Sequence, residues 1–215
     1  MNASARAGAR FGIVQIYALV FGIALGVISV SLMAFEVNLL AAALTLLAIA
    51  YYVVVYTMLL KRTTPQNIVI GGAAGAVPPL VGWAAAAGRL DLTALAFFAV
   101  ILFWTPPHFW ALAQMIKTDY ARANIPMLPV VAGEQSAKRQ SIVYAALTAG
   151  VSVVPFFTGS AGATYLAGAI VLGLGLVGIT VLDLEGRRWT RRLWTYSMVY
   201  LALLFALFAA SPFLP

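Results

Sequence analysis

Long apolar stretches, separated by short polar segments, follow one another along the whole chain. A helix needs roughly 20 apolar residues to cross a bilayer. Stretches of about that length occupy residues 11–33, 37–60, 66–88, 91–115, 139–158, 162–182 and 193–213. Segments such as 39–50 are apolar on every side, whereas a transmembrane β-strand alternates apolar with polar residues. The pattern therefore predicts an all-α membrane protein, a bundle of about seven transmembrane helices.

Composition supports this class. Hydrophobic residues make up 63% of the 215 residues and charged residues 9%, and the mean hydropathy is +0.99, well above that of a soluble domain. The longest polar stretch, 117–140, is too short to be a soluble domain, so residues 1–215 are expected to form one transmembrane domain. The chain has no cysteine, which excludes disulfides, thiolate metal sites and covalent c-type heme attachment.

Positive charge is distributed unevenly across the predicted membrane. Of the 13 lysines and arginines, all but Arg89 fall on one side. These are Arg6, Arg10, Lys61, Arg62, Lys117, Arg122, Lys138, Arg139, Arg187, Arg188, Arg191 and Arg192. Cytoplasmic loops are enriched in such residues, so we expect a multi-pass protein of the cell inner membrane with a cytoplasmic N-terminus. The same rule accounts for the net charge of +7, and nucleic acid is therefore not expected as a partner.

The first polar loop that could carry chemistry runs over residues 56–67. Lys61 and Arg62 stand close to Gln66 and Asn67, at the expected start of the next helix. The free amides of a helix N-terminus favour an anion, so a phosphate group could bind there. Anchoring of a helix end by the two cations explains the same residues equally well.

The second candidate region joins Thr105-Pro-Pro-His-Phe-Trp110 to Asp119. Ionisable residues are expensive at bilayer depth and indicate function there. A helix continued for eleven residues from His108 would place Asp119 on the same face, about 16 Å away at 1.5 Å per residue. That spacing suits a long substrate. Pro106 and Pro107 are expected to bend the helix just before His108.

Aromatic residues surround this region in the sequence. Trp104, Phe109, Trp110 and Trp83 suit a planar apolar ligand or a cation derived from one. Tryptophans also gather at membrane interfaces for reasons of solvation alone. His108 is itself compatible with a packed, hydrogen-bonded role.

Three motifs together resemble a known family. Residues 56–83, Trp104-Thr-Pro-Pro-His-Phe-Trp-Ala-Leu-Ala113, and Asp119-Tyr-Ala-Arg-Ala-Asn-Ile-Pro-Met-Leu-Pro-Val-Val131 are similar to the heme O synthases, or protoheme IX farnesyltransferases, a branch of the UbiA-type intramembrane prenyltransferases. The resemblance covers essentially the whole chain. It implies transfer of a farnesyl group from farnesyl diphosphate to a vinyl group of heme B, with Mg²⁺ holding the diphosphate.

The resemblance also implies roles for individual residues. Asp119 matches an acidic motif that binds magnesium and diphosphate, and Lys61 and Arg62 match a basic loop that pairs with phosphate oxygens. Further substrate-binding candidates are Lys117, Arg122, Asn67, Tyr56 and Trp104. Contact of His108 with the heme iron or with a propionate is a hypothesis.

The chain departs from the family pattern in its acidic residues. The superfamily has nine spans and an Asn-x-x-x-Asp-x-x-x-Asp motif after the second, which this sequence lacks. Its seven helices match the last seven of nine, and Asp119 stands alone where many members carry paired aspartates. One carboxylate is a poor magnesium site. We therefore expect this N-terminally truncated chain, lacking the first two helices of the family, to be impaired in farnesyl transfer.

Two other functions stay open. A related prenyltransferase could act on a quinone precursor, although the Thr-Pro-Pro-His-Phe-Trp segment belongs to the heme branch. A non-catalytic protein could instead keep a heme or lipid pocket and act as a membrane scaffold for oxidase assembly. Contact with heme A synthase or a terminal oxidase in assembly is a corresponding expectation.

Overall fold

The computed structural model describes the backbone of residues 3–213 and the side chains of residues 14–213. Over these residues all regular structure is helical. The longer elements are α1 (Ala3–Leu32) with η1 (Met33–Val37), α2 (Leu39–Ala50) with η2 (Tyr51–Leu60), α3 (Asn67–Ala76), α4 (Pro78–Ala87), α5 (Leu92–Met115), α8 (Glu134–Ser152), α10 (Ala163–Leu182) and α11 (Arg187–Ala210). Shorter pieces are α6 (Lys117–Arg122), α7 (Leu128–Val131), α9 (Val154–Phe157), η3 (Asp183–Glu185) and η4 (Ser211–Phe213).

The prediction of seven membrane-spanning helices is confirmed for the described part of the chain. The spans are Val14–Val37, Leu39–Leu60, Asn67–Ala87, Leu92–Met115, Glu134–Phe157, Ala163–Glu185 and Arg187–Phe213. The fifth begins at Glu134 rather than 139, and the seventh at Arg187 rather than 193. Charged residues lower the hydropathy of a segment but do not end a helix, so both helices extend past their apolar stretches.

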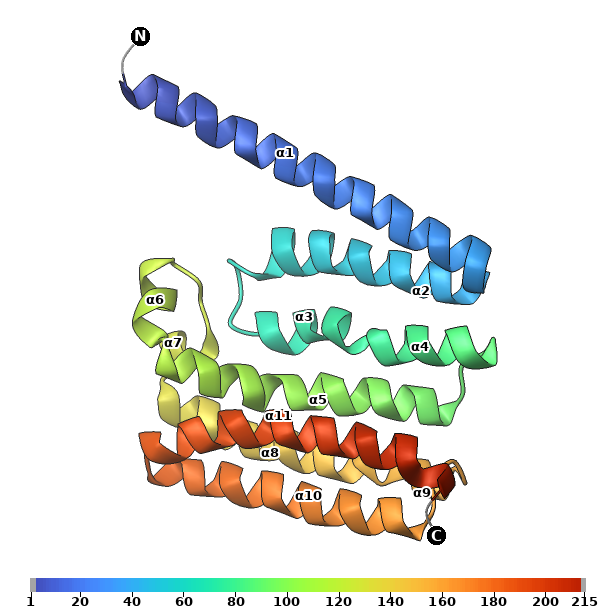
Figure 1. Cartoon of the computed structure of the whole chain (residues 1–215). Coiled ribbons are helices and arrows are strands. Elements are labelled where there is room, and N and C mark those ends of the chain that lie inside the picture. Colours follow the sequence, from blue (N-terminus) through green and yellow to red (C-terminus); the bar gives the residue numbers. More distant parts are fainter. Residues whose placement is uncertain (1–2, 214–215) are drawn as a thin grey trace.

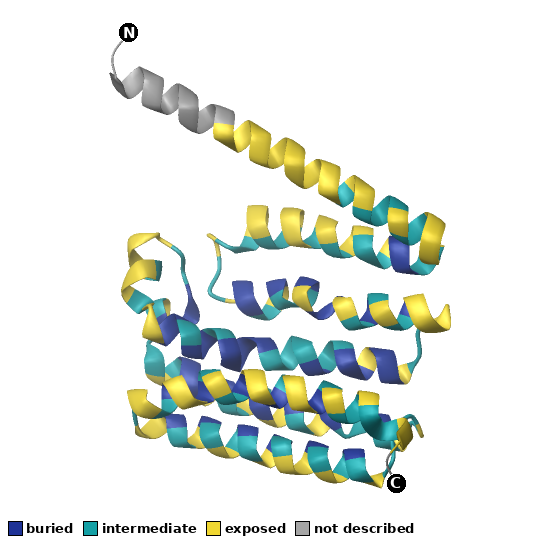
Figure 2. Ribbon diagram, in the orientation of Figure 1, coloured by how far each residue is buried: buried dark blue, intermediate teal, exposed yellow. Residues whose placement is uncertain are grey.

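The longer helices from α2 to α11 lie side by side with nearly parallel axes, whereas α1 diverges from them toward its N-terminus (Figure 1). Helix α5 is central and packs against α3 on one side and against α8 and α11 on the other. The main core joins Val100 of α5 to Tyr165 and Leu176 of α10 and to Tyr200 and Leu204 of α11. Buried residues concentrate around α5, and most of the residues of α1 whose side chains are described, 14–32, are exposed (Figure 2).

Side-chain caps fix where two of the spans begin. The Asn38 side chain caps α2, and Asp91 Oδ1 accepts hydrogen bonds from the backbone N–H groups of Thr93 (3.0 Å) and Ala94 (3.1 Å) at the start of α5. Such caps satisfy donors that the helix itself leaves unpaired. Trp83 Nε1 donates to the other oxygen of Asp91 at 3.1 Å. This tryptophan therefore belongs to a helix cap and not to an aromatic site around α5.

The prolines act differently in two helices. Only Val77 separates α3 from α4. Pro78 and Pro79 are the first two residues of α4, where the helix does not need their N–H groups. Pro106 and Pro107 lie inside α5, which is one helix from Leu92 to Met115.

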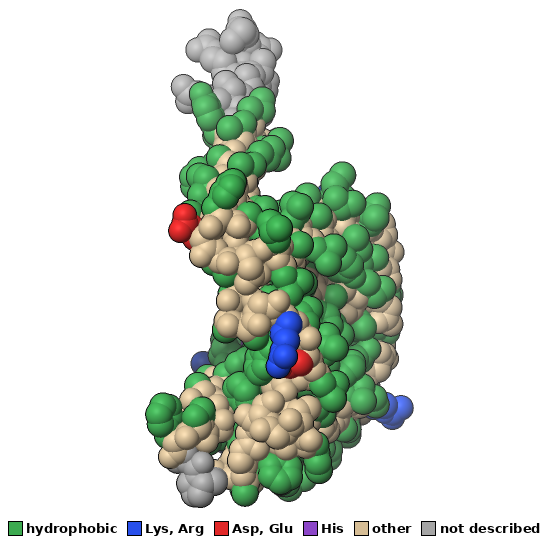
Figure 3. All heavy atoms as spheres, turned by 90° about the vertical axis from the view of Figure 1, so that its right-hand side faces the viewer, with side chains coloured by type: hydrophobic (Ala, Val, Ile, Leu, Met, Phe, Trp, Pro, Cys, Tyr) green, Lys and Arg blue, Asp and Glu red, His purple; other side chains and the backbone are tan. Residues whose placement is uncertain are grey.

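Charged side chains gather at one end of the helix stack. The segments between α2 and α3, between α5 and α8, and between α10 and α11 all lie at the left-hand end in Figure 1. The opposite end, which faces the viewer in Figure 3, is mostly hydrophobic and carries few charges. The side chains of Arg6 and Arg10, which contributed to the predicted orientation, lie outside the described side chains.

Candidate functional site

A cavity of about 580 Å³ lies between α2 with η2, α3 and α5. Apart from Thr105, its walls are apolar or aromatic, and the aromatic side chains come from η2 and α5. They are Tyr52, Tyr56, Trp104 and Phe109. Pockets of this size and composition are typical of sites for small molecules.

The wide helical turns of η2 position two of these aromatic residues. In this π-helical segment backbone hydrogen bonds join residues five apart, as from Lys61 N to Tyr56 O at 2.8 Å. The side-chain hydroxyl of Thr57 also donates to Tyr52 O, at 2.9 Å. The rings of Tyr52 and Tyr56 lie 5.3 Å apart between centroids. Helical segments of this kind are rare and occur frequently at functional sites.

Glycines on α3 let the Tyr56 ring lie directly against that helix. A Cβ atom added to Gly71 would stand 2.1 Å from Tyr56 Cδ2, and one added to Gly72 would stand 3.1 Å from Thr105 Cγ2. These distances leave no room for a side chain at Gly71. The small residues therefore bring α3 close to η2 and α5 and shape the cavity.

His108 is buried on another side of α5, between that helix and α11. Its Nδ1 lies 2.8 Å from Ser197 Oγ, and its ring stacks on Trp104 at 4.3 Å and on Trp194 at 6.1 Å between centroids. Trp104 Nε1 donates to Ser197 O at 2.7 Å. His108 is thus a packed, hydrogen-bonded residue and is not among those that line the cavity. Its partner Ser197 carried no signal in the sequence.

Trp110 is also separate from the cavity. It is fully buried and packs edge-on against Tyr144 of α8 at 5.7 Å. The sequence indicated four aromatic candidates, Trp83, Trp104, Phe109 and Trp110. Of these, only Trp104 and Phe109 line the cavity.

The prediction of one continuous helix from His108 to Asp119 is wrong. Helix α5 ends at Met115, and Ile116 has φ −116° and ψ 33°, outside the helical region, before α6 begins at Lys117. The face shared by His108 and Asp119 was derived from uninterrupted helical periodicity, so it does not exist. Asp119 instead lies on the short helix α6, where it is exposed.

Helix α6 is held near the end of the cavity by Tyr120. This side chain packs with Phe109 against a cluster formed by Ile68, Ala113 and Met127. Ile68 and Phe109 also line the cavity. Burial raises the pKa of Tyr120 above its ordinary value of 10.0, so its phenol stays protonated at neutral pH and can donate a hydrogen bond.

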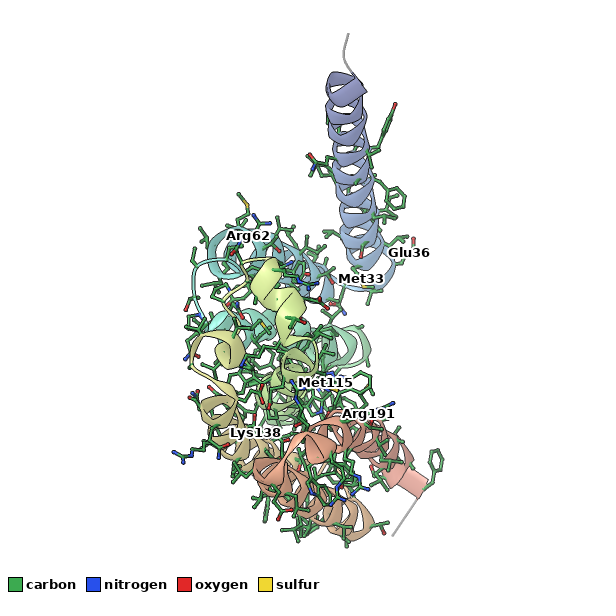
Figure 4. All side chains as sticks on the ribbon, turned by 90° about the vertical axis from the view of Figure 1, so that its left-hand side faces the viewer. Met33, Glu36, Arg62, Met115, Lys138 and Arg191 are labelled. Carbon is green, nitrogen blue, oxygen red and sulfur yellow. The ribbon has the colours of Figure 1, made fainter. Side chains whose placement is uncertain are left out.

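Polar residues of the α2–α3 loop lie at the same end. Asn67 is buried, and its Nδ2 donates to Lys61 O at 3.3 Å, while its Oδ1 has no hydrogen-bond partner among the described residues. Lys61 is partly exposed and Arg62 is exposed. Figure 4 looks onto this end, with Arg62 at its periphery. The structure therefore brings Asn67 to Lys61 and leaves the two cations accessible.

Lys117 and Arg122 differ in their surroundings. Lys117 Nζ lies 3.6 Å from Glu134 Oε1, an oxygen that also lies 3.9 Å from Arg187. Arg122 is exposed on α6. Among residues 14–213 no ion pair joins Asp119 to a cation.

The described residues do not form a metal site by themselves. No group of three or more histidine, cysteine, aspartate or glutamate residues comes together among them. A magnesium ion is usually held by one or two carboxylates together with substrate phosphates and water. Asp119 by itself supplies only one carboxylate, which is too few ligands for a magnesium site formed by the protein alone.

One buried polar cluster was not expected from the sequence. Lys138 of α8 donates to Asp183 O at 2.6 Å and lies 3.4 Å from Asp183 Oδ1, to which Thr190 Oγ1 donates at 2.5 Å. Asp183 is fully buried and Lys138 is 5% exposed. The pattern of apolar residues gave no sign of this ion pair, because hydropathy does not report a pairing between distant segments.

Comparison with known proteins adds independent information. Residues 12–198 match the model of the UbiA prenyltransferase family. The chain is 51% identical over 196 residues to a protoheme IX farnesyltransferase of Thermus thermophilus, covering 90% of this chain and 32% of that protein. Identity is 48% over 201 residues (90% and 67%) for a protein of that name from Rhizorhabdus wittichii and 50% over 191 residues (87% and 63%) for one from Gloeobacter violaceus. The chain thus spans about one third to two thirds of the length of these relatives. No solved structure matches it.

Proposed function

This chain belongs to the UbiA prenyltransferase family, and we propose that it transfers a farnesyl group from farnesyl diphosphate to a vinyl group of heme B to give heme O. The single observation that carries the proposal is the aromatic cavity whose end lies close to the Lys61–Asn67 loop and to α6. The relatives named protoheme IX farnesyltransferase supply the choice of substrates.

The cavity is proposed to hold the isoprenoid chain. Its apolar walls match a hydrocarbon, and a volume of about 580 Å³ lies within the range of small-molecule sites. The faces of Tyr52, Tyr56 and Trp104 offer negative electrostatic potential to an allylic cation. A water-poor cavity also protects such a cation from premature capture by water.

The polar end of the cavity is proposed to bind the diphosphate. Lys61 and Arg62 would pair with phosphate oxygens, and Asn67 lies in the first turn of α3, where free backbone amides favour an anion. Asp119 and the phenol of Tyr120 would face the same group from α6, with Arg122 and Lys117 as further cations. These cations favour departure of the diphosphate, because negative charge develops on the leaving oxygen in the transition state and is attracted to them more strongly than in the substrate.

In the proposed reaction the allylic C–O bond breaks and diphosphate leaves with the electron pair. The vinyl carbon of heme B then forms a bond to the farnesyl carbon. Water adds to the resulting cation and gives up one proton to the diphosphate or to solvent, which leaves the neutral hydroxyl group of heme O. A divalent cation is typical for diphosphate binding in this family, and Mg²⁺ with Asp119 as one ligand is our proposal. Because the described residues form no metal site by themselves, no step is assigned to the ion.

The roles of His108 and of the membrane orientation are also proposals. His108 could reach a heme iron or propionate through the α5–α11 interface, where it now bonds to Ser197. We propose the inner membrane as location and the cytoplasm as the compartment facing the cationic end. Delivery of the product to heme A synthase or a terminal oxidase in assembly would follow there.

Heme extraction tests the proposal. Membranes that contain this chain receive heme B and farnesyl diphosphate, and the hemes are separated and identified by mass. We expect heme O with the native sequence, in a reduced amount because the lone carboxylate Asp119 is a poor magnesium site. We expect still less with Asp119→Asn or Lys61→Gln, and the native amount with the exposed control Arg139→Gln. Bound heme B that is never farnesylated would contradict the proposal and support the non-catalytic scaffold. Prenylation of a quinone precursor instead of heme would support the other alternative.

A further inference from the structure

A second, cationic groove lies between α10 and α11, away from the proposed site. It has a volume of about 630 Å³. Its polar half is formed by arginines in the first two turns of α11, and its apolar half includes Ile179 and Val199. The arginines are Arg187, Arg188, Arg191 and Arg192. We propose that this groove binds one phospholipid with an anionic headgroup, an inference that does not depend on the proposed catalytic function.

The arginines form a cluster of positive charge that is already in place without a ligand. The guanidinium carbons of Arg188 and Arg192 lie 5.4 and 4.7 Å from the centroid of the same Trp189 ring. This shared stacking holds two like charges together, at some cost in mutual repulsion. Of the four arginines, only Arg187 has a carboxylate partner among residues 14–213, at 3.9 Å from Glu134. The other three offer unneutralised charge to an anion.

The apolar half of the groove continues down the helices. Tyr196 crosses to α10, where its hydroxyl donates to Leu172 O at 3.0 Å. A Cβ atom at Gly175 would stand 2.1 Å from that hydroxyl oxygen, so the glycine makes room for the hydroxyl end of the ring against α10. Arg188 and Val199 are eleven residues apart, about 16 Å along the helix. That length accommodates a phosphate, a glycerol and the first part of an acyl chain.

The combination of charge and apolar surface identifies the occupant. The positive-inside rule explains why arginines stand at this end of the protein but not why four of them border one groove. A free phosphate would contact only the arginines and would leave the apolar surface of the groove without an apolar ligand. Basic pockets between transmembrane helices are known binding sites for anionic lipid headgroups, and an anionic phospholipid fills both halves.

Native mass spectrometry of the purified chain tests the proposal. The chain is mixed in non-ionic detergent with phosphatidylglycerol or with phosphatidylcholine, and bound lipid is counted. We expect stronger binding of phosphatidylglycerol, and about fivefold weaker binding for each of Arg188→Gln and Arg192→Gln. Arg139→Gln removes an equally exposed arginine from α8 and should leave lipid binding unchanged. Circular dichroism verifies that each variant remains helical.

Three results would overturn the inference. One is equal binding of the two lipids by the native chain. Another is unchanged phosphatidylglycerol binding by a folded Arg188→Gln/Arg192→Gln variant. The third is displacement of the lipid by inorganic pyrophosphate at an equal concentration, which would identify a site for free anions. Loss of lipid binding with normal heme O formation would separate this groove from the catalytic proposal.

Discussion

The two sides of α5 are built in different ways. On the side of α8, α10 and α11, large side chains such as Tyr165, Leu176 and Tyr200 are almost completely buried. On the other side, beyond α3 and α4, an 18-residue stretch of the first span contains no buried residue, and in such a stretch of the second span 11% of the residues are buried. Figure 2 shows the same contrast between the dark helices around α5 and the exposed α1.

Polar groups differ between the two sides as well. In the dense half some of them pair with one another, as Lys138 does with Asp183 and His108 with Ser197. In the open half, the aromatic and small residues of η2 and α3 border a cavity. We conclude that the dense half is stabilised by its own contacts, whereas the open half leaves surface for a ligand, for lipid or for other helices.

The largest effect is expected from breaking the buried pair. Asp183→Leu leaves the Lys138 charge buried without its partner, which should lower the free energy of unfolding by about 3–5 kcal/mol. Denaturant unfolding in detergent, followed by tryptophan fluorescence, measures the loss. Glu185→Gln, an exposed neighbour, is the control. A Lys138→Met/Asp183→Leu variant should recover most of the stability; if it is as unstable as Asp183→Leu alone, the stranded charge is not the cause.

A smaller effect on stability, with a larger effect on activity, is expected in the open half. Gly71→Ala would push the Tyr56 ring out of its position, since the added Cβ would stand 2.1 Å from Cδ2. Overpacking of this kind costs about 1–3 kcal/mol, and farnesyl transfer should fall by more than the stability change explains. Gly82→Ala, where nothing lies within 4 Å, is the matched control. Normal turnover with Gly71→Ala would show that the position of Tyr56 does not matter.

The next effect concerns the α5–α11 interface. Ser197→Ala removes the hydroxyl that lies 2.8 Å from His108 Nδ1 and should cost on the order of 1 kcal/mol. The same unfolding measurement applies, with the exposed Thr195→Ala as control. If stability is unchanged in Ser197→Ala, the histidine is not held by this hydrogen bond.

The smallest effect is expected at the exposed ion pairs of the cationic end. Glu134 shares one oxygen between Lys117 and Arg187 at 3.6 and 3.9 Å, with side chains that are 32–76% exposed. Glu134→Gln should change the unfolding free energy by less than about 1 kcal/mol, and salt should reduce the difference further. If Glu134→Gln lowered the unfolding free energy as much as Asp183→Leu does, exposed and buried ion pairs would not differ in their contribution to stability.

The sequence predicts the spans well because crossing a bilayer requires a long apolar segment. It fails where tertiary contacts decide: nothing local indicated that Ile116 would leave the helical region, or that Lys138 would be buried. The motifs contain Tyr56 and Trp104, and both residues line one cavity. They could not show that His108, although in the same motif, faces α11, because the side that a residue presents depends on which helices surround it.

The central claim is that the cavity between η2, α3 and α5 holds the isoprenoid chain. A farnesyl diphosphate analogue that carries a photoreactive group at the end of its chain tests this directly, when it is crosslinked in membranes and the labelled peptides are mapped by mass spectrometry. The account predicts label on the peptides containing Tyr52 and Tyr56 or Trp104 and Phe109, suppressed by excess farnesyl diphosphate. Specific label confined to the α10–α11 groove or to α1 would contradict it.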